Sequence, residues 1–551
     1  MATEKSNTGF SDIQLETAAP NVSALQNADI HDKSLNAGAQ EATMQEHNMG
    51  FIQGIKTYKR AAMWSILISA TIIMEGYDVT LVPSFFGYPR FRERYGEYTG
   101  EEHGWQITAT WQQRFQCLGA LANIIGALAN GWATAKWGHR KVLMASLVML
   151  TGFIFIAFFA PNIEIQLLGQ FLCNLPWGVF ATTGPAYAAE VTPLAIRGYL
   201  TAYINLCWCT GQFLSAGILA GLVNNPTDWS WRVPFAIQWV WPVPLFIAAY
   251  LAPESPWYLV RTNQLEAAKK SLQRLSEPEH NVDYDATIAM MVHTDKIEKA
   301  EREGVTYYDA FRGTNRRRTE IAIMCFLSQI TNGGAMAYSG SFFFQQTGIS
   351  DDTAYDISLG GTGIAFIGVI ISWFYIYKFG RRTIWLTGFA TLTLILWTIG
   401  ILAAIPNQTD GLAWGQSILC IVWLGAYSMS VGPIVYTIVA EIGSTRLRTQ
   451  TVVLGRSFYY VGNIICGGLL YPQMMSPTGW NLAGLTAFFW AGLATLTLAW
   501  GYFRLMETKD RTFGEMDVIF QKGVSARKSS KYVIEQDEIF DVRMEDERRD
   551  N

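Results

Sequence analysis

The sequence predicts an all-α membrane protein with twelve transmembrane helices arranged as two six-helix halves. Half of the 551 residues are hydrophobic and only 16% are charged, which is unlike the composition of a soluble domain. Apolar segments of roughly 20 residues recur along the chain, and each is long enough to cross a hydrocarbon core as a helix. Short charged motifs that follow these segments return after about 250 residues, which predicts a duplicated membrane unit.

Twelve apolar segments are the candidate spans. They lie near residues 61–82, 107–132, 142–160, 164–189, 200–223, 235–252, 320–346, 358–377, 383–404, 412–440, 450–472 and 484–505. A polar stretch separates the sixth segment from the seventh. The sequence therefore divides into a first bundle at 57–252, a linker at 253–319 and a second bundle at 320–506.

Three motifs repeat in the same order in the two bundles. The pairs are Gly138 with Gly380, Glu190 with Glu441, and Glu254 with Glu507, at offsets of 242, 251 and 253 residues. An arginine also follows each glutamate of the second pair by seven residues, at Arg197 and Arg448. Three motifs in register indicate a duplication much more strongly than one would.

The segments outside the two bundles are predicted from their composition. Residues 1–56 are poor in aromatic side chains and are predicted to be a disordered tail without a signal peptide. Within the linker, residues 265–275 have a helical period, so short helices are expected there. The charged tail at 507–551 is predicted to be disordered after Arg511.

Basic residues predict the orientation of the chain in the membrane. Lys56, Lys59 and Arg60 precede the first span, and most later basic loops alternate with loops that lack Lys and Arg. Both termini are therefore expected in the cytoplasm of a multi-pass protein of the plasma membrane, with Arg90, Arg92, Arg94 and Arg232 as exceptions to the alternation. Asn407, in an Asn-Gln-Thr sequence on the expected outside, is a candidate glycosylation site, and an unmodified chance sequon is the alternative.

Other chemistry finds little support in the sequence. All seven cysteines fall inside predicted spans, so no extracellular disulfide framework is expected. No metal cluster, nucleophile constellation or phosphate-binding glycine loop stands out, so we expect neither an enzyme nor a cofactor. The expected partners are the lipid bilayer, a small molecule and protons; we expect no nucleic acid and a monomeric chain.

Two carboxylates, Glu75 and Asp78, lie inside the first span and share one helical face. A charge at this depth needs a partner, a water-filled cavity or a proton. The candidate counter-charges within spans are Arg114 and Arg456. Counting along each helix from its expected cytoplasmic end puts Asp78 at about 26 Å, Arg114 at about 27 Å and Arg456 at about 12 Å. This depth favours Arg114 as the counter-ion of Asp78. The alternative is that Arg114 extends to the outer headgroups.

The motifs resemble those of the sugar porters of the major facilitator superfamily. The resemblance covers residues of roughly 75–511 and rests on Gly76–Asp78, Gly138–Lys141, Glu190–Arg197, Pro253–Pro256, Gly380–Arg382, Glu441–Arg448 and Glu507–Arg511. Leu175–Phe180 and Asn205–Gln212 look most like the fungal maltose and α-glucoside permease branch. The resemblance implies the major facilitator fold and a gating role, through ion pairs between the halves, for Arg140, Glu190, Arg197, Glu254, Arg382, Glu441 and Arg448. Anchoring of helix ends is the alternative role for each.

A sugar site needs amides and aromatic faces in a water-accessible cavity. Asn205 and Gln212 share one face of the fifth span, and Gln329 and Asn332 share one face of the seventh, before two glycines that break it. The resemblance places Tyr338, Tyr436 and Asn463 beside these amides at positions that sugar porters use. Hydrogen bonding between helices is the alternative role of each amide.

Several residues depart from the family pattern. Gln170 stands where proton-coupled sugar porters usually have Arg, Gly334 stands at a usual Asn position, and Asn123 is neutral where the α-glucoside branch tends to carry an acid. The expected function is alternating-access transport of an α-glucoside or other oligosaccharide with proton symport. The alternatives are a sugar sensor that does not transport and a transporter of another small metabolite.

Overall fold

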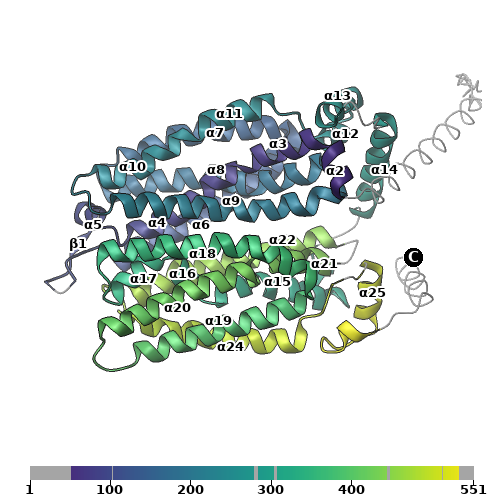
Figure 1. Cartoon of the computed structure of the whole chain (residues 1–551). Coiled ribbons are helices and arrows are strands. Elements are labelled where there is room, and N and C mark those ends of the chain that lie inside the picture. The colour runs from purple at the N-terminus through teal and green to yellow at the C-terminus, as the bar shows by residue number, and fades with distance from the viewer. Residues whose placement is uncertain are drawn as a thin grey trace, which may run out of the picture.

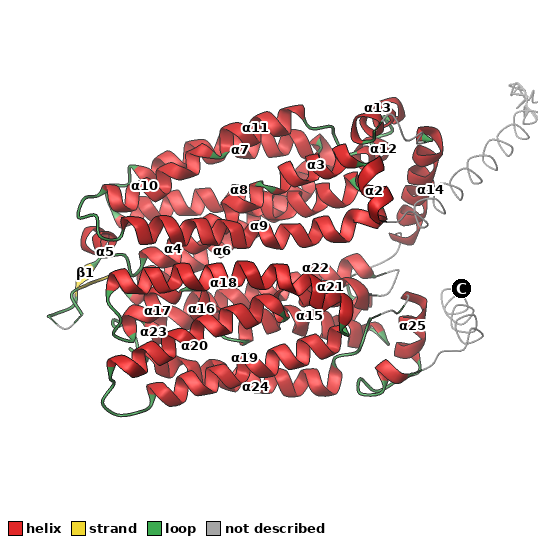
Figure 2. Cartoon of the chain, in the orientation of Figure 1, coloured by secondary structure: helices red, strands yellow, loops and turns green. Residues whose placement is uncertain are grey.

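The structure, a computed structural model, describes residues 51–101, 103–277, 283–302, 307–443, 447–509, 511 and 513–532. Helices dominate this part of the chain (Figure 2). Its strands form one small antiparallel hairpin, in which β1 (Glu97–Tyr98) pairs with β2 (Trp105–Gln106). The predicted all-α fold class is confirmed.

The first half contains ten α-helices and one 3-10 turn. They are α2 (Phe51–Thr57), α3 (Lys59–Ser69), α4 (Thr71–Phe85), α5 (Pro89–Tyr95), α6 (Ala109–Trp137), α7 (His139–Phe158), α8 (Ile163–Val191), α9 (Leu194–Leu222), α10 (Trp229–Ile237), η1 (Gln238–Val240) and α11 (Pro242–Leu251). Short helices of the linker follow: α12 (Pro256–Arg261), α13 (Leu265–Leu275), α14 (Tyr284–Arg302) and the 3-10 turn η2 (Asp309–Phe311). The helix α13 covers the residues whose helical period the sequence shows.

The second half repeats this arrangement. Its elements are α15 (Asn315–Thr331), α16 (Gly334–Tyr338), α17 (Gly340–Gln346), α18 (Asp351–Lys378), α19 (Arg381–Ala403), α20 (Asp410–Met429), α21 (Val431–Ile442), α22 (Arg448–Asn463), the π-helical turn η3 (Ile464–Leu470), α23 (Tyr471–Met475), η4 (Ala483–Leu485) and α24 (Thr486–Arg504). After it come α25 (Phe513–Gln521) and η5 (Ser529–Lys531).

These elements form twelve long helical segments in the described residues, six in each half, at the positions of the twelve apolar segments. Eight of them are apolar and long enough, by composition alone, to cross a membrane. The other four are α8, α9, and the interrupted segments α15–α17 and α22–α23. Interruptions and amide-rich faces are expected where helices line a polar cavity.

The two predicted tails need correction where they are described. The sequence predicts a disordered tail up to residue 56, but residues 51–56 belong to the helix α2. The tail after Arg511 forms α25 and η5, and Met516, Ile519 and Phe520 of α25 are buried against the second half. Residues 1–50 and 533–551 lie outside the described residues.

The two halves lie side by side, with the first half coloured purple to blue and the second green to yellow (Figure 1). The linker helices and α25 lie at one end of the molecule, and α5 and the hairpin lie at the other (Figure 1). The first of these ends also carries Arg140 and Arg382 at the starts of α7 and α19. We call it the basic end, and the other the opposite end.

Glycines allow helices to approach closely within the first half. A Cβ atom at Gly211 of α9 would lie 2.1 Å from the backbone oxygen of Ile73, and one at Gly76 of α4 would lie 2.4 Å from that of Trp208. The pair α4 and α9 is therefore in backbone contact, as is common where helices associate in membranes. This contact fixes the height of Glu75 beside the amides of α9.

Polar contacts join the two halves at the opposite end. Arg92 of α5 forms a 2.8 Å ion pair with Asp351 of α18, and Gln345 of α17 donates to the carbonyl of Gly87 at 2.8 Å. The backbone N–H of Ala109 donates to Thr478, also at 2.8 Å. The opposite end is thus held closed. Arg92 is one of the arginines that break the predicted alternation of basic loops. Arg90, another of them, pairs with Asp228 at 3.3 Å in the same region.

Candidate functional site: a central cavity

A cavity of about 310 Å³ lies between the two halves. Its size lies at the lower end of the range of about 300–1,000 Å³ that is common for small-molecule sites. Six of the seven predicted sugar-site residues line it: Asn205, Gln212, Gln329, Tyr338, Tyr436 and Asn463. The cavity therefore brings together amides and aromatic rings from α9, α15, α16, α21 and α22.

The seventh predicted residue, Asn332, is not brought to the cavity. Its side chain is fully buried, and its Oδ1 atom accepts a 3.0 Å hydrogen bond from the backbone N–H of Gly334. Gly333 next to it has a φ of 84°, which favours glycine. Asn332 therefore stabilises the break between α15 and α16. The helical period that placed it beside Gln329 ends one residue earlier, at Thr331.

Tyrosines form much of the cavity wall, and the sequence analysis missed most of them. The additional ones are Tyr427, Tyr459, Tyr460 and Tyr471. Tyr338 and Tyr427 meet edge to face, with ring centroids 6.1 Å apart. Tyrosine offers both an aromatic face and a hydroxyl group, so this wall can contact the apolar face and the hydroxyls of a sugar ring.

Arg456 lies in an aromatic cage on the second-half side of the cavity. Its guanidinium carbon lies 4.6 Å from the ring centroid of Tyr459, 5.1 Å from that of Tyr460 and 5.7 Å from that of Phe326. Its Nη1 atom also donates to the hydroxyl of Tyr436 at 3.2 Å. Aromatic faces stabilise a cation in a site with little water.

Glu75 faces this cage from the first half. It lines the same cavity, it interacts electrostatically with Arg456, and Trp208 of α9 is its hydrogen-bonding neighbour. Its Oε2 atom has no hydrogen-bond partner within the described residues. A carboxylate and a guanidinium from different halves thus share one cavity.

Asp78 lies behind the cavity wall, where it is bound by two amides. Gln170 of α8 donates to one of its oxygens at 2.7 Å, and Gln238 of η1 donates to the other at 2.9 Å. Gln170, which stands where proton-coupled sugar porters usually have Arg, is therefore a direct partner of Asp78. Two amide donors satisfy a buried carboxylate without a neighbouring cation.

The prediction that Arg114 is the counter-ion of Asp78 is wrong in this structure. Arg114 is exposed, and its guanidinium lies 4.5 Å from the ring centroid of Trp111 on the same helix. Depth along a helix fixes the height of a residue but not the direction in which its side chain points. Arg114 is thus exposed beside Trp111, and its extension to the outer headgroups stays a prediction.

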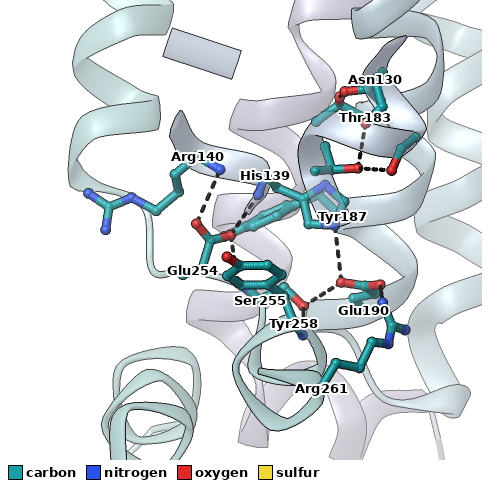
Figure 3. A network of polar contacts seen from close by, with 12 residues as sticks. Asn130, His139, Arg140, Thr183, Tyr187, Glu190, Glu254, Ser255, Tyr258 and Arg261 are labelled. Atoms are coloured by element: carbon teal, nitrogen blue, oxygen red, sulfur yellow. Dashed lines mark hydrogen bonds and ion pairs between the residues drawn. The ribbon is translucent and has the colours of Figure 1, made fainter. Parts of the chain in front are cut away.

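The repeated charged motifs form one polar network in each half at the basic end, and Figure 3 shows the network of the first half. In the first half Glu254 accepts from the backbone N–H of His139 at 3.0 Å, and in the second Glu507 accepts from that of Arg381 at 2.8 Å. Arg140 and Arg382 donate to backbone carbonyls of their own halves. The expected pairs between halves are not seen for these side chains, and the side chains of Arg197 and Arg448 lie outside the described part.

Asn407 is exposed in the loop between α19 and α20, at the opposite end. Its φ of 61° places it in the left-handed region, where Asn is tolerated. The seven cysteines are all free. Within the described ranges, no group of three metal-binding side chains is present.

Comparisons with known proteins agree with this geometry. A family model described as Sugar (and other) transporter matches residues 64–520. A maltose permease of Saccharomyces cerevisiae is 35% identical over 517 residues, which are 92% of this chain and 83% of the permease. The general alpha-glucoside permease of Saccharomyces cerevisiae is 34% identical over 513 residues, with 92% and 82% covered.

Solved structures show the same fold. The partially occluded inward open conformation of the xylose transporter XylE from E. coli superposes with a TM-score of 0.66 at 16% identity, covering 83% of this chain and 99% of that one. A second structure, described as the proton:xylose symporter XylE bound to 6-bromo-6-deoxy-D-glucose, has a TM-score of 0.65 at 18% identity, with 85% and 100% covered.

Proposed function

Because the chain belongs to the sugar (and other) transporter family of membrane proteins, we propose that it carries an α-glucoside across the membrane together with protons. The observation that carries the proposal is the cavity between the halves, where amides and tyrosines lie beside the Glu75 and Arg456 charges. The similarity to a maltose permease and a general alpha-glucoside permease of yeast supports the substrate class. An oligosaccharide fits a wall that offers several aromatic faces.

The proposed orientation puts the basic end in the cytoplasm of a protein of the plasma membrane, as the positive-inside rule requires. Both termini then lie inside, the opposite end faces outward, and Asn407 is accessible to glycosylation. Contacts at the opposite end hold the outer entrance closed in this structure, so they must break before a sugar enters from outside. A monomer contains the whole cavity, since both halves belong to one chain.

The proposed gating set remains Arg140, Glu190, Arg197, Glu254, Arg382, Glu441 and Arg448. Their described contacts stiffen the basic end of each half, so that each half can rock as one body. The ion pairs between the halves are then proposed to involve Arg197 and Arg448. They form in the state in which the basic end is closed.

The proton site is proposed to be Glu75 with Arg456, and Asp78 is proposed as a second carboxylate that responds through α4. A proton on Glu75 removes the attraction that joins the halves through the cavity, and departure of the proton restores it. Arg114 is no longer part of this proposal.

Transport itself is tested with radiolabelled maltose in yeast that lacks its own maltose carriers. The proposal expects accumulation against a gradient, alkalinisation of the medium and loss of accumulation with an uncoupler. Uptake that never responds to the proton gradient would contradict proton symport, and no uptake of any α-glucoside would contradict the substrate class.

Alanine at Asn205, Gln212 or Gln329 is expected to weaken sugar binding. Each change removes a hydrogen bond worth about 1 kcal/mol, so KM should rise about fivefold for each variant. A matched control is Asn130→Ala, because Asn130 of α6 bonds Thr182 and Thr183 and does not line the cavity. That variant should lower the amount of protein and leave KM unchanged. Unchanged KM in all three cavity variants would assign these amides to packing.

A further inference from the structure

The polar networks of the two halves match nearly contact for contact. Ser255 donates its hydroxyl to Glu190 in the first half, and Thr508 donates its hydroxyl to Glu441 in the second. In each network a nitrogen-bearing side chain also contacts this glutamate. His139 Nε2 lies 3.1 Å from Glu190 Oε2 in the first half, and Arg381 Nη2 lies 3.1 Å from Glu441 Oε1 in the second. His139 and Arg381 follow the paired residues Gly138 and Gly380, so they are equivalent positions.

The difference between the two networks is the nature of this nitrogen-bearing side chain. Arginine keeps its charge at every physiological pH, whereas histidine side chains in general gain or lose a proton between about pH 5 and pH 8. The second-half network is therefore always an ion pair. In the first half Arg261 also pairs with Glu190, and the contact between His139 and Glu190 becomes a second ion pair only when His139 is protonated.

The surroundings of His139 suit a proton-binding side chain. It is buried at the start of α7, and Figure 3 shows its ring directed at Glu190 from the neighbouring helix α8. Because Nε2 faces a carboxylate, it carries a hydrogen in both charge states. Protonation adds a hydrogen at Nδ1, which is buried without a hydrogen-bond partner within the described residues, so attraction to Glu190 has to outweigh the cost of burying this N–H.

The other ionisable groups around the ring do not compete for this role. Arg261 of α12 binds the second oxygen of Glu190 at 2.9 Å, and burial together with Glu254 holds the pKa of Tyr258 above its usual value. Glu190 and Tyr187 contact the ring, and the titratable or charged residues around them are Glu254, Tyr258, Arg261, Arg140, Lys136 and Arg274. Glu190 is the carboxylate that the ring itself contacts.

We propose that His139 is a proton-binding site through which the pH at the basic end sets the strength of the first-half network. At acidic pH the imidazolium and Arg261 both hold Glu190, which ties α7, α8 and the linker helix α12 together. At alkaline pH Arg261 and Ser255 still hold Glu190, and the neutral imidazole donates a hydrogen bond to it without adding a charge. The proposal rests on the proposed function for its consequence, which is a transporter whose rate responds to cytoplasmic pH apart from the proton gradient.

The primary test measures thermal unfolding of the purified full-length protein between about pH 5 and pH 8. His139→Arg fixes the charge and His139→Gln removes it, so the wild-type Tm should follow the Arg variant at acidic pH and the Gln variant at alkaline pH. The two limits should differ by about 1–2 °C, because the Tm shift for a given change in stability becomes smaller as the chain becomes longer. His293→Gln, an exposed residue of α14, is the matched control and should reproduce the wild-type curve.

A variant that adds a titratable side chain to the second network keeps the test decisive if either His139 variant fails to fold. Arg381→His places a titratable cation in the second network, so its Tm curve should acquire an additional acid-dependent step. Equal pH dependence of wild type, His139→Arg and His139→Gln would overturn the proposal. So would an Arg381→His curve that is parallel to the wild-type curve.

Exchange of labelled maltose across vesicles with equal pH on both sides measures the consequence for transport. Protonation stabilises the network in the state seen here, so the wild-type exchange rate should fall several-fold as the pH is lowered, and the rate of His139→Arg should fall less. Identical profiles would contradict the regulatory consequence. Absence of exchange in every variant would instead contradict the proposed substrate and leave the unfolding result to decide the proton site.

Discussion

Replacing Arg456 by Gln is expected to abolish accumulation of sugar. The guanidinium is the positive charge that acts on Glu75 inside the cavity. Removing the guanidinium leaves the buried Glu75 carboxylate without a compensating charge in the cavity, which is strongly unfavourable. Accumulation of labelled maltose against a gradient is the measurement.

Two further variants separate coupling from folding. Glu75→Gln removes the carboxylate and should leave exchange of sugar intact, while accumulation and its dependence on pH disappear. Arg114→Gln is the matched control, since that arginine lies on an exposed face and stacks on Trp111. The assignment of the proton site fails if Arg456→Gln accumulates sugar at the wild-type level, or if Arg114→Gln loses accumulation.

Replacing Gly211 by Leu is expected to prevent assembly of the first half. A Cβ atom there would lie 2.1 Å from the oxygen of Ile73 and 2.6 Å from the backbone nitrogen of Tyr77, and neither backbone atom can yield without separating α4 from α9. Overpacking a core ordinarily costs about 1–3 kcal/mol, and a clash with backbone lies beyond that range.

The control for this variant lies on the same helix. A Cβ atom at Gly221 would meet nothing within 4 Å, so Gly221→Leu should fold normally. The amount of correctly folded protein at the cell surface, measured with a fluorescent fusion, compares the two. Equal amounts would show that the close contact of α4 with α9 does not limit folding.

The sequence predicts the fold well because its signals are local or periodic. Length and apolarity mark the spans, and the offset between Glu190 and Glu441 marks the duplication. Both signals come directly from the chemistry of a bilayer, in which every backbone group must be satisfied within the helix. The sequence does not predict the helix α25, because it stands in a charged tail. Its few apolar residues, such as Phe520, are nevertheless buried against the second half.

The site is predicted only in part, because it depends on the direction of side chains. Amides at helical spacing, such as Asn205 and Gln212, reach the cavity together. Asn332 does not, because a helix break changes the period after Thr331. Arg114 has the right height and the wrong direction. The tyrosines around Arg456 can be predicted from helical spacing. Tyr459 and Tyr460 follow Arg456 by three and four residues, which places the three side chains on one helical face.

The central claim is that the opposite end must open and close for sugar to cross. A reversible cross-link at that end tests it most directly. A Cβ atom at Gly87 would lie 2.0 Å from the side-chain oxygen of Gln345, so cysteines at these two positions can form a disulfide between the halves. The two single-substitution variants, Gly87→Cys and Gln345→Cys, and a cysteine pair at Asn130 and Thr182 within the first half, serve as controls for the native cysteines.

Oxidation of the Gly87→Cys, Gln345→Cys variant should stop maltose uptake, and a reducing agent should restore it, while oxidised controls continue to transport. Uptake at the wild-type rate with the cross-link fully formed would contradict alternating access through this end.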